Sequence, residues 1–253
     1  MAKIRIEDIE PIGMQKSQIN FSGLKDLPWV SCIMPTSDRR AFTSKAVEYF
    51  LRQDYPKREL VVVDDGEDSV RDLVPGDSHI RYIYLNQKTP VGAKRNLACE
   101  EAKGNIILHW DDDDWMARQR ISYQVRALIK EQADICGLNR VIFYNPLNSQ
   151  SWLYIYQERG KPWVYGGTLC YTKKYWGKHP FPEINVGEDN YFVWSSPLRK
   201  VTILHDPTFY ISLIHPGNTS PKRTTDIQWH SYPTAEVRAL IGQDCTFYDH
   251  LKL

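Results

Sequence analysis

The chain has 253 residues, of which 42% are hydrophobic and 25% are charged, a composition typical of a soluble folded domain with one substantial core. Lys and Arg number 32 against 31 Asp and Glu, so no broad basic field exists to hold a nucleic acid or an anionic membrane by charge alone. We therefore expect no nucleic-acid partner, and any anionic ligand must be bound by a local group of residues.

Residues 1–28 show no sustained hydrophobic period and contain two prolines and two glycines, which predicts an irregular N-terminal segment. Acidic residues stand where a signal peptide would need an apolar run, and no stretch approaches the roughly 18 apolar residues of a transmembrane helix. We expect a cytoplasmic protein without a transmembrane segment, with a peripheral position at the inner membrane face as the alternative.

The five cysteines are widely spaced and never occur as C-x-x-C. This pattern argues against a disulfide framework and against a zinc site. We expect reduced cysteines in the core.

From Trp29 onward, apolar strands alternate with helical stretches. Thr89 before Pro90 predicts an N-cap and a first-turn proline for the second helix. The alternation predicts an α/β fold with a mostly parallel central sheet flanked by helices. The predicted strands are 29–35, 59–64, 80–85 and 105–110, and the predicted helices are 41–53, 91–102 and 116–132.

The second half is richer in aromatic and β-branched residues, with little helix between the apolar runs at 135–145, 151–157 and 163–172. Such runs predict a smaller mixed or antiparallel region beside the parallel sheet. We expect a single domain over 29–253, with a nucleotide-binding half at 29–132 and an acceptor half at 133–253.

Polar residues follow three of the predicted strands. Open α/β sheets bind ligands at the carboxyl ends of their parallel strands, so Pro35-Thr36, Asp64-Asp65 and the run Asp111–Asp114 should converge. A dinucleotide site of the Rossmann type is disfavoured, because PTSDRR after the first strand lacks the glycine-rich turn.

The four successive aspartates of Asp111–Asp114 are the most informative feature. Adjacent carboxylates raise one another's pKa or recruit a cation, and oxygen ligands without cysteine favour Mn²⁺ or Mg²⁺. An EF-hand does not fit, because Met116 and Ser122 occupy the positions that need glycine and glutamate. The alternative is a solvated acidic turn that caps the following helix.

VSCIMPT, ELVVVDDG, VGAKRN and KGNIILHWDDDDW, in this order and spacing, resemble the family 2 glycosyltransferases of GT-A fold. The resemblance is close over about 29–132 and looser over 163–220. It implies a transferase that inverts the anomeric configuration, with a UDP-sugar favoured as donor and GDP or TDP donors open. The acceptor could be a glycan, a lipid-linked molecule, a protein or a small molecule, and the oligomeric state is open.

The resemblance also implies roles for individual residues. The family's D-x-D motif falls within the aspartate run in a register uncertain by one, with Asp113 as the direct metal ligand and Asp111 and His215 as further candidates. Asp189 in GEDNYFVW would be the general base, with Glu188 as its substitute. The implied nucleotide contacts are Pro35, Thr36, Asp64, Asp65, Lys94, Arg95, Asp111 and Asp112.

Each implied role has a structural alternative. Lys94 and Arg95 could form a solvated helix face, Asp64-Asp65 an ordinary turn, and His215 a structural histidine. Trp163, Gly166 and Gly167 could shape an acceptor pocket, because aromatic faces stack on sugars and glycines let a substrate approach the backbone, but aromatic residues in a β-rich half more often form core.

Two other functions fit parts of the sequence. A metal-dependent phosphoesterase or nucleotide hydrolase would use the aspartates to hold an ion that activates water, and would cleave its substrate without an acceptor. A carbohydrate-binding protein would use the aromatic residues, 12% of the chain, and would leave Asp111–Asp114 without a role.

Overall fold

The computed structural model describes residues 27–157, 160–197 and 200–251, so the predicted irregular segment 1–28 lies almost wholly outside the described residues. The larger of two sheets has the strand order β10-β6-β9-β4-β1-β2-β3. Neighbouring strands from β4 to β3 are parallel, β10 is parallel to β6, and β9 runs antiparallel between β4 and β6. The predicted, mostly parallel sheet is confirmed. Its strands are β1 (Val30–Thr36), β2 (Arg58–Asp64), β3 (Ile80–Tyr84), β4 (Ile106–His109), β6 (Ile135–Leu138), β9 (Cys170–Thr172) and β10 (Val201–Leu204).

The smaller sheet has the order β12-β8-β7-β11-β5 and is mixed, because β11 is parallel to β7 while its other pairs are antiparallel. The apolar run at 135–145 supplies both sheets, since the chain leaves β6 and enters β7 within two residues. The predicted smaller mixed region is therefore present. Its strands are β5 (Trp115–Met116), β7 (Arg140–Asn145), β8 (Gln150–Ile155), β11 (Tyr210–Leu213) and β12 (Trp229–Ser231).

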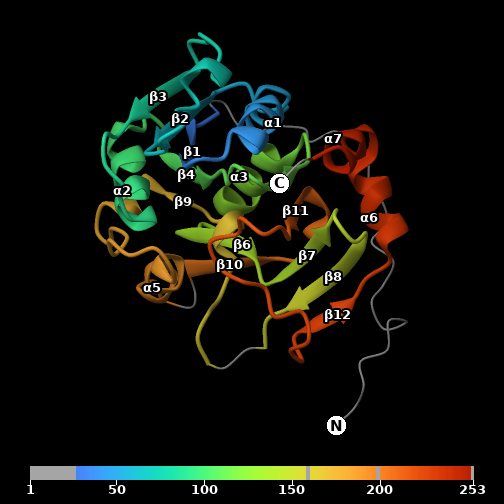
Figure 1. Ribbon diagram of the computed structural model, residues 1–253. Helices are drawn as coiled ribbons and strands as arrows, with labels where there is room; N and C mark the ends of the chain where they lie inside the picture. The colour runs from blue at the N-terminus through green and yellow to red at the C-terminus, as the bar shows by residue number, and fades with distance from the viewer. Residues whose placement is uncertain (1–26, 158–159, 198–199, 252–253) are drawn as a thin grey trace.

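Helices cover both faces of the larger sheet, α1 and α3 on one face and α2 and α5 on the other (Figure 1). Side chains of a strand point alternately to its two faces. Cys32 and Met34 therefore join the cluster under α1 and α3, while Ile33 joins the one under α2 and α5. The helices are α1 (Arg40–Leu51), α2 (Val91–Glu101), α3 (Arg120–Lys130), α4 (Lys173–Trp176), α5 (Glu188–Trp194), α6 (Thr234–Ile241) and α7 (Cys245–Asp249), and the short 3-10 turns are η2 (Arg71–Leu73), η3 (Gly166–Thr168), η5 (Pro207–Phe209) and η6 (Gly242–Asp244).

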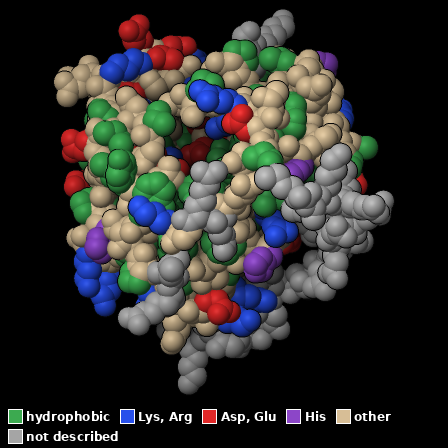
Figure 2. Space-filling model, turned by 90° about the horizontal axis from the view of Figure 1, so that it is seen from below, with side chains coloured by type: hydrophobic (Ala, Val, Ile, Leu, Met, Phe, Trp, Pro, Cys, Tyr) green, Lys and Arg blue, Asp and Glu red, His purple; other side chains and the backbone are tan. Residues whose placement is uncertain are grey.

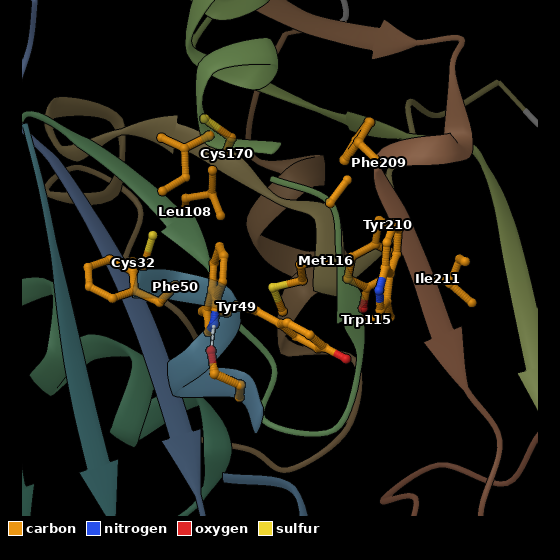
Figure 3. Packing of buried hydrophobic residues seen from close by; sticks show 14 of the residues in the cluster. Cys32, Tyr49, Phe50, Leu108, Trp115, Met116, Cys170, Phe209, Tyr210 and Ile211 are labelled. Atoms are coloured by element: carbon orange, nitrogen blue, oxygen red, sulfur yellow. Dashed lines mark hydrogen bonds between the residues drawn. The ribbon is translucent and has the colours of Figure 1, made fainter. Parts of the chain in front are cut away.

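One hydrophobic cluster joins the two sheets. Figure 3 shows it running from Cys32 and Leu108 of the larger sheet, through Met116, to Tyr210 and Ile211 of the smaller sheet. All five cysteines are buried and free, which confirms their predicted place in the core. Within the described part of the chain, no helix has both the length and the apolar character needed to cross a bilayer.

The predicted helix 116–132 is wrong at its start. Trp115 and Met116 form a short strand paired with Ile211 and Tyr210, and α3 begins only at Arg120. Both side chains are at most 5% exposed. Tertiary burial against β11 therefore decides the local conformation over the helical pattern of the sequence.

The predicted N-cap at Thr89 is also wrong. Its hydroxyl donates to the Gln87 carbonyl, and the cap residue of α2 is Pro90, which has no side-chain oxygen. The first N–H groups of a helix need acceptors from outside the helix. Here they come from a distant segment, because Val91 N–H donates to Asn185 Oδ1 at 3.1 Å and Gly92 N–H donates to the Ile184 carbonyl at 3.0 Å.

This contact predicts a strict requirement for glycine at position 92. A Cβ on Gly92 would lie 1.9 Å from the Pro182 carbonyl oxygen, so Gly92→Ala must push the segment away from α2. We expect a loss of about 1–3 kcal/mol of unfolding free energy, the usual cost of forcing extra atoms into packed space, measured by urea denaturation. Gly76→Ala is the matched control, since a Cβ there meets nothing within 4 Å; equal stability of the two variants would contradict this packing.

Candidate active site

A hollow of about 740 Å³ opens at the carboxyl ends of β1 and β4. It is lined by the end of β1, the aspartate run after β4, the turn η3, the start of α5 and residues between 212 and 222. Figure 2 looks into this hollow from below, with acidic side chains at its floor. The expected convergence at the sheet edge is thus present for Pro35, Thr36 and the aspartate run, all of which line the hollow.

Each aspartate of the run has its own partners, so the run is not a solvated turn. Asp112 accepts a hydrogen bond of 2.6 Å from the Thr36 hydroxyl, and burial raises its pKa to about 7. Asp114 accepts from the Tyr210 hydroxyl and, at 2.8 Å, from the Leu213 N–H, and burial raises its pKa well above the usual range. Asp114 therefore ties the run to β11.

Asp113 is the aspartate of the run whose pKa lies below the ordinary value. One of its oxygens, Oδ2, accepts from Arg39, from His215 Nε2 at 3.0 Å and from Asn218 Nδ2 at 3.5 Å. Burial opposes ionisation of Asp113, but the hydrogen bond from His215 and the positive charge of Arg39 outweigh it and lower the pKa to about 2. Asp113 is thus an ionised carboxylate at neutral pH, facing the hollow.

The predicted nucleotide residue Arg95 instead bridges two acidic residues. Its guanidinium donates to Glu188 and lies 3.5 Å from Asp111 Oδ1. Burial raises the pKa values of Glu188 and Asp111, and the charge of Arg95 opposes both shifts. Arg95 is only 6% exposed, so the solvated-face alternative fails, and its role at the base or diphosphate stays a prediction.

A glycine turn brings the predicted base and the predicted acceptor residues together. A Cβ on Gly166 would lie 2.2 Å from Asp189 Oδ2, and one on Gly167 would lie 2.6 Å from Asp111 Oδ2. Trp163 Nε1 donates to the side chain of Asn190, the residue after Asp189, at 2.8 Å. Side chains at the two glycine positions would therefore displace carboxylates that line the hollow.

Glu188 and Asp189 occupy different environments at the start of α5. Both residues line the hollow, but Glu188 is buried and accepts a hydrogen bond from Arg95, whereas Asp189 is half-buried. The sequence predicted that neighbouring helical residues cannot both face an acceptor. The geometry favours Asp189 over its substitute, and the base role itself stays a prediction.

Asp64 and Asp65, at the end of the second predicted strand, have hydrogen-bond partners within the protein. Asp64 is fully buried and accepts from the Gly66 N–H, the Val70 N–H and the Tyr82 hydroxyl. Lys94 is also buried and donates to Asp65 and to the Thr36 carbonyl. Asp64 therefore shapes the loop beside β1 and does not line the hollow, whereas Lys94 does line it, and the roles of both residues toward a nucleotide stay predictions.

Sequence reasoning missed two arginines. Arg39 lines the hollow and reaches Asp113, and its only sequence signal is its place directly after the first strand. Arg120 is fully buried beneath the aspartates, donating to the carbonyls of His109 and Gly167, with its guanidinium over the rings of Trp110 and Tyr210. No local pattern in the sequence marks Arg120.

Comparison with known proteins identifies the family. The profile described as "Glycosyl transferase family 2" matches residues 31–182, more than half of the chain. The chain belongs to glycosyltransferase family 2.

The putative colanic acid biosynthesis glycosyl transferase WcaA of Escherichia coli is 35% identical over 104 residues, which cover 39% of this chain and 37% of that protein. The putative teichuronic acid biosynthesis glycosyltransferase TuaG of Bacillus subtilis is 29% identical over 108 residues, covering 41% of this chain and 43% of that protein. The chain therefore aligns with well under half the length of these family 2 relatives.

Solved structures agree on the fold. TarS of S. aureus, residues 1–349 in complex with UDP-GlcNAc, superposes with a TM-score of 0.58 at 19% identity, covering 76% of this chain and 60% of that one. The mannosyltransferase PcManGT of Pyrobaculum calidifontis, in complex with GDP-Man and Mn²⁺, gives a TM-score of 0.58 at 18% identity, covering 79% and 59%. The predicted GT-A fold is confirmed for this family 2 chain.

The residues present fit a divalent ion that takes most of its ligands from elsewhere. In the described residues, no three or more His, Cys, Asp or Glu side chains converge as a metal site, and Asp111 Oδ1 lies 3.5 Å from the Arg95 guanidinium. Asp113 nevertheless offers an ionised carboxylate oxygen at the hollow, and His215 Nε2, which donates to that oxygen at 3.0 Å, can become a second ligand once its proton leaves that nitrogen. This donor pair suits Mn²⁺ when phosphate and water complete the coordination.

The contacts of the run predict opposite consequences for two adjacent aspartates. Asp114→Ala leaves the Tyr210 hydroxyl and the Leu213 N–H buried without their acceptor, at a cost of about 1–3 kcal/mol for each unsatisfied group. We expect a large fall in the denaturation midpoint for Asp114→Ala and a much smaller one for Asp113→Ala. Urea unfolding of both variants checks this, and a larger loss for Asp113→Ala would contradict the assignment of Asp114 to the fold.

Proposed function

We propose that the chain transfers a sugar from a nucleotide diphosphate, with a UDP-sugar favoured, to an acceptor hydroxyl with inversion at the anomeric carbon. The observation that carries the proposal is the pairing, around one hollow, of an ionised carboxylate after β4 with a second carboxylate at the start of α5. Membership of glycosyltransferase family 2 supports it. The relatives' names point to polysaccharide synthesis, which makes a glycan or lipid-linked acceptor the favoured class.

Asp113 and His215 would hold Mn²⁺ or Mg²⁺ on the donor side. A divalent ion bound there would neutralise the charge that develops on the departing diphosphate, in place of a protonating acid. Pro35 and Thr36 line the same hollow and would contact the nucleoside. Thr36 also fixes Asp112 by its hydroxyl, so the nucleoside and diphosphate subsites share one rigid edge.

Asp189 would act on the acceptor side. The bond between the anomeric carbon and the diphosphate oxygen breaks as the acceptor oxygen attacks from the opposite face, and the acceptor proton passes to the Asp189 carboxylate. The absence of a side chain at Gly166 lets this carboxylate lie against the turn, and Trp163, which donates to Asn190, would stack on a sugar ring of the acceptor. A single displacement of this kind inverts the anomeric configuration.

The proposal keeps the division into a donor half at 29–132 and an acceptor half at 133–253, except that one proposed metal ligand crosses it. His215, on the donor side, comes from the later half. The later half also supplies Asp189, Trp163 and the glycine turn, which supports its acceptor role.

The metal role predicts that Asp113→Ala loses Mn²⁺-dependent nucleotide binding. The variant removes the ionised oxygen that the ion needs, so titration calorimetry with UDP should show no gain in affinity on adding Mn²⁺. Asp68→Asn, a surface carboxylate beside Arg40, should bind as the wild type does. Undiminished Mn²⁺-dependent binding by Asp113→Ala would refute the role.

The base role predicts that Asp189→Asn retains donor affinity and loses transfer by about 10²-fold or more, the scale of lost general-base catalysis. The measurement compares UDP-sugar affinity with UDP release in the presence of acceptor. Glu183→Gln, an exposed acidic residue five positions before α5, is the matched control. A collapse of donor affinity in Asp189→Asn would make Asp189 a binding or structural residue, and rapid donor cleavage without acceptor would favour the phosphoesterase alternative.

A further inference from the structure

Arg39 connects the aspartate run to residues 217–219, which follow it by almost 180 positions in the sequence. Its Nη1 donates to Asp113 and lies 3.6 Å from Asp112 Oδ1. Its Nη2 donates to the Gly217 carbonyl at 2.6 Å and lies 3.4 Å from the Thr219 hydroxyl. One guanidinium therefore bridges the end of β4 and residues 217–219, and both segments line the hollow.

The positive charge of Arg39 offsets the free-energy cost of burying the carboxylates of Asp112 and Asp113. The Asp113 side chain is 12% exposed and that of Asp112 is 6% exposed, and a buried carboxylate needs a positively charged or hydrogen-bonding partner. Arg39 supplies the positive charge from the solvent side, since its own side chain is 17% exposed. It donates to the same Asp113 oxygen, Oδ2, that His215 contacts.

An ion that binds this oxygen must compete with Arg39, because a carboxylate oxygen has few acceptor positions and two cations cannot share them without repulsion. A nucleotide diphosphate changes the balance. Its phosphate oxygens accept bidentate hydrogen bonds from a guanidinium as well as a carboxylate does. A diphosphate that binds together with the ion thus gives Arg39 a new hydrogen-bond acceptor when the ion takes its place on Asp113.

We propose that Arg39 is a positioning residue that changes its hydrogen-bond partner when the donor binds. Without donor, Arg39 contacts Asp113 and residues 217–219. It releases Asp113 when a divalent ion enters together with a nucleotide diphosphate. The inference rests on the metal role in the proposed function. Two consequences follow. The ion binds weakly to the free protein and tightly with nucleotide, and each ligand strengthens the binding of the other by the same factor.

The neighbouring Arg40 provides a matched control. It points elsewhere, donating to the Asp72 carboxylate and the Ser69 carbonyl, and does not line the hollow. Arg40→Gln removes the same charge from the same helix end without touching the aspartate run. Any effect of Arg39→Gln on ion binding that Arg40→Gln lacks is therefore specific to the bridge.

The test measures Mn²⁺ binding by the wild type, Arg39→Gln and Arg40→Gln, using the electron paramagnetic resonance signal of free Mn²⁺, without nucleotide and with saturating UDP. We expect Arg39→Gln to bind Mn²⁺ at least about 5-fold more tightly without nucleotide, the lower end of typical coupling between sites. The gain on adding UDP should shrink by a similar factor. Arg40→Gln should match the wild type in both conditions.

Unchanged or weaker Mn²⁺ binding by Arg39→Gln, with wild-type thermal unfolding, would overturn the inference and make Arg39 a brace or a simple phosphate ligand. If Arg39→Gln does not fold, Arg39→Lys tests the same point. A single ammonium cannot bridge both segments, so Mn²⁺ should again bind more tightly than in the wild type, and equal affinity would contradict the bridge. Failure of the wild type to bind Mn²⁺ even with UDP would instead refute the metal role in the proposed function.

Discussion

The burial of four consecutive carboxylates at the end of one strand is the constraint around which this site is built. Such a run is unstable unless each charge is neutralised, paired or protonated. The fold meets this requirement differently at each position. Asp114 accepts hydrogen bonds from β11, Asp112 accepts one from the Thr36 hydroxyl, and Asp111 lies beside Arg95. Asp113, which contacts Arg39 and His215, is the aspartate whose pKa is lowered.

This distribution explains why the smaller sheet is part of the site. Asp114 and Tyr210 tie β11 to the run, and β11 leads directly into the loop that carries His215. Arg120 makes a similar connection, because its guanidinium donates to the His109 carbonyl at the end of β4 and to the Gly167 carbonyl. The aspartate run and the glycine turn are therefore held at a fixed separation by buried polar contacts, which favours a preorganised site.

The sequence predicted the parts that rest on local pattern. Apolar runs located the parallel strands, and the rule for strand ends located the hollow through Pro35, Thr36 and the aspartates. It failed where distant segments decide the outcome. Met116 pairs with a strand almost a hundred residues away, and α2 is capped by Asn185. Arg39 and Arg120 were missed because only the folded chain brings them to the carboxylates.

The central claim is that Asp113 holds an ion which in turn holds the donor diphosphate. Anomalous diffraction at the manganese edge, from crystals grown with Mn²⁺ and UDP, tests it most directly. The account predicts a single strong peak within ligand distance of an Asp113 oxygen and of the diphosphate, with Arg39 no longer on that oxygen. A nucleotide bound in the hollow with no manganese beside Asp113 would contradict it.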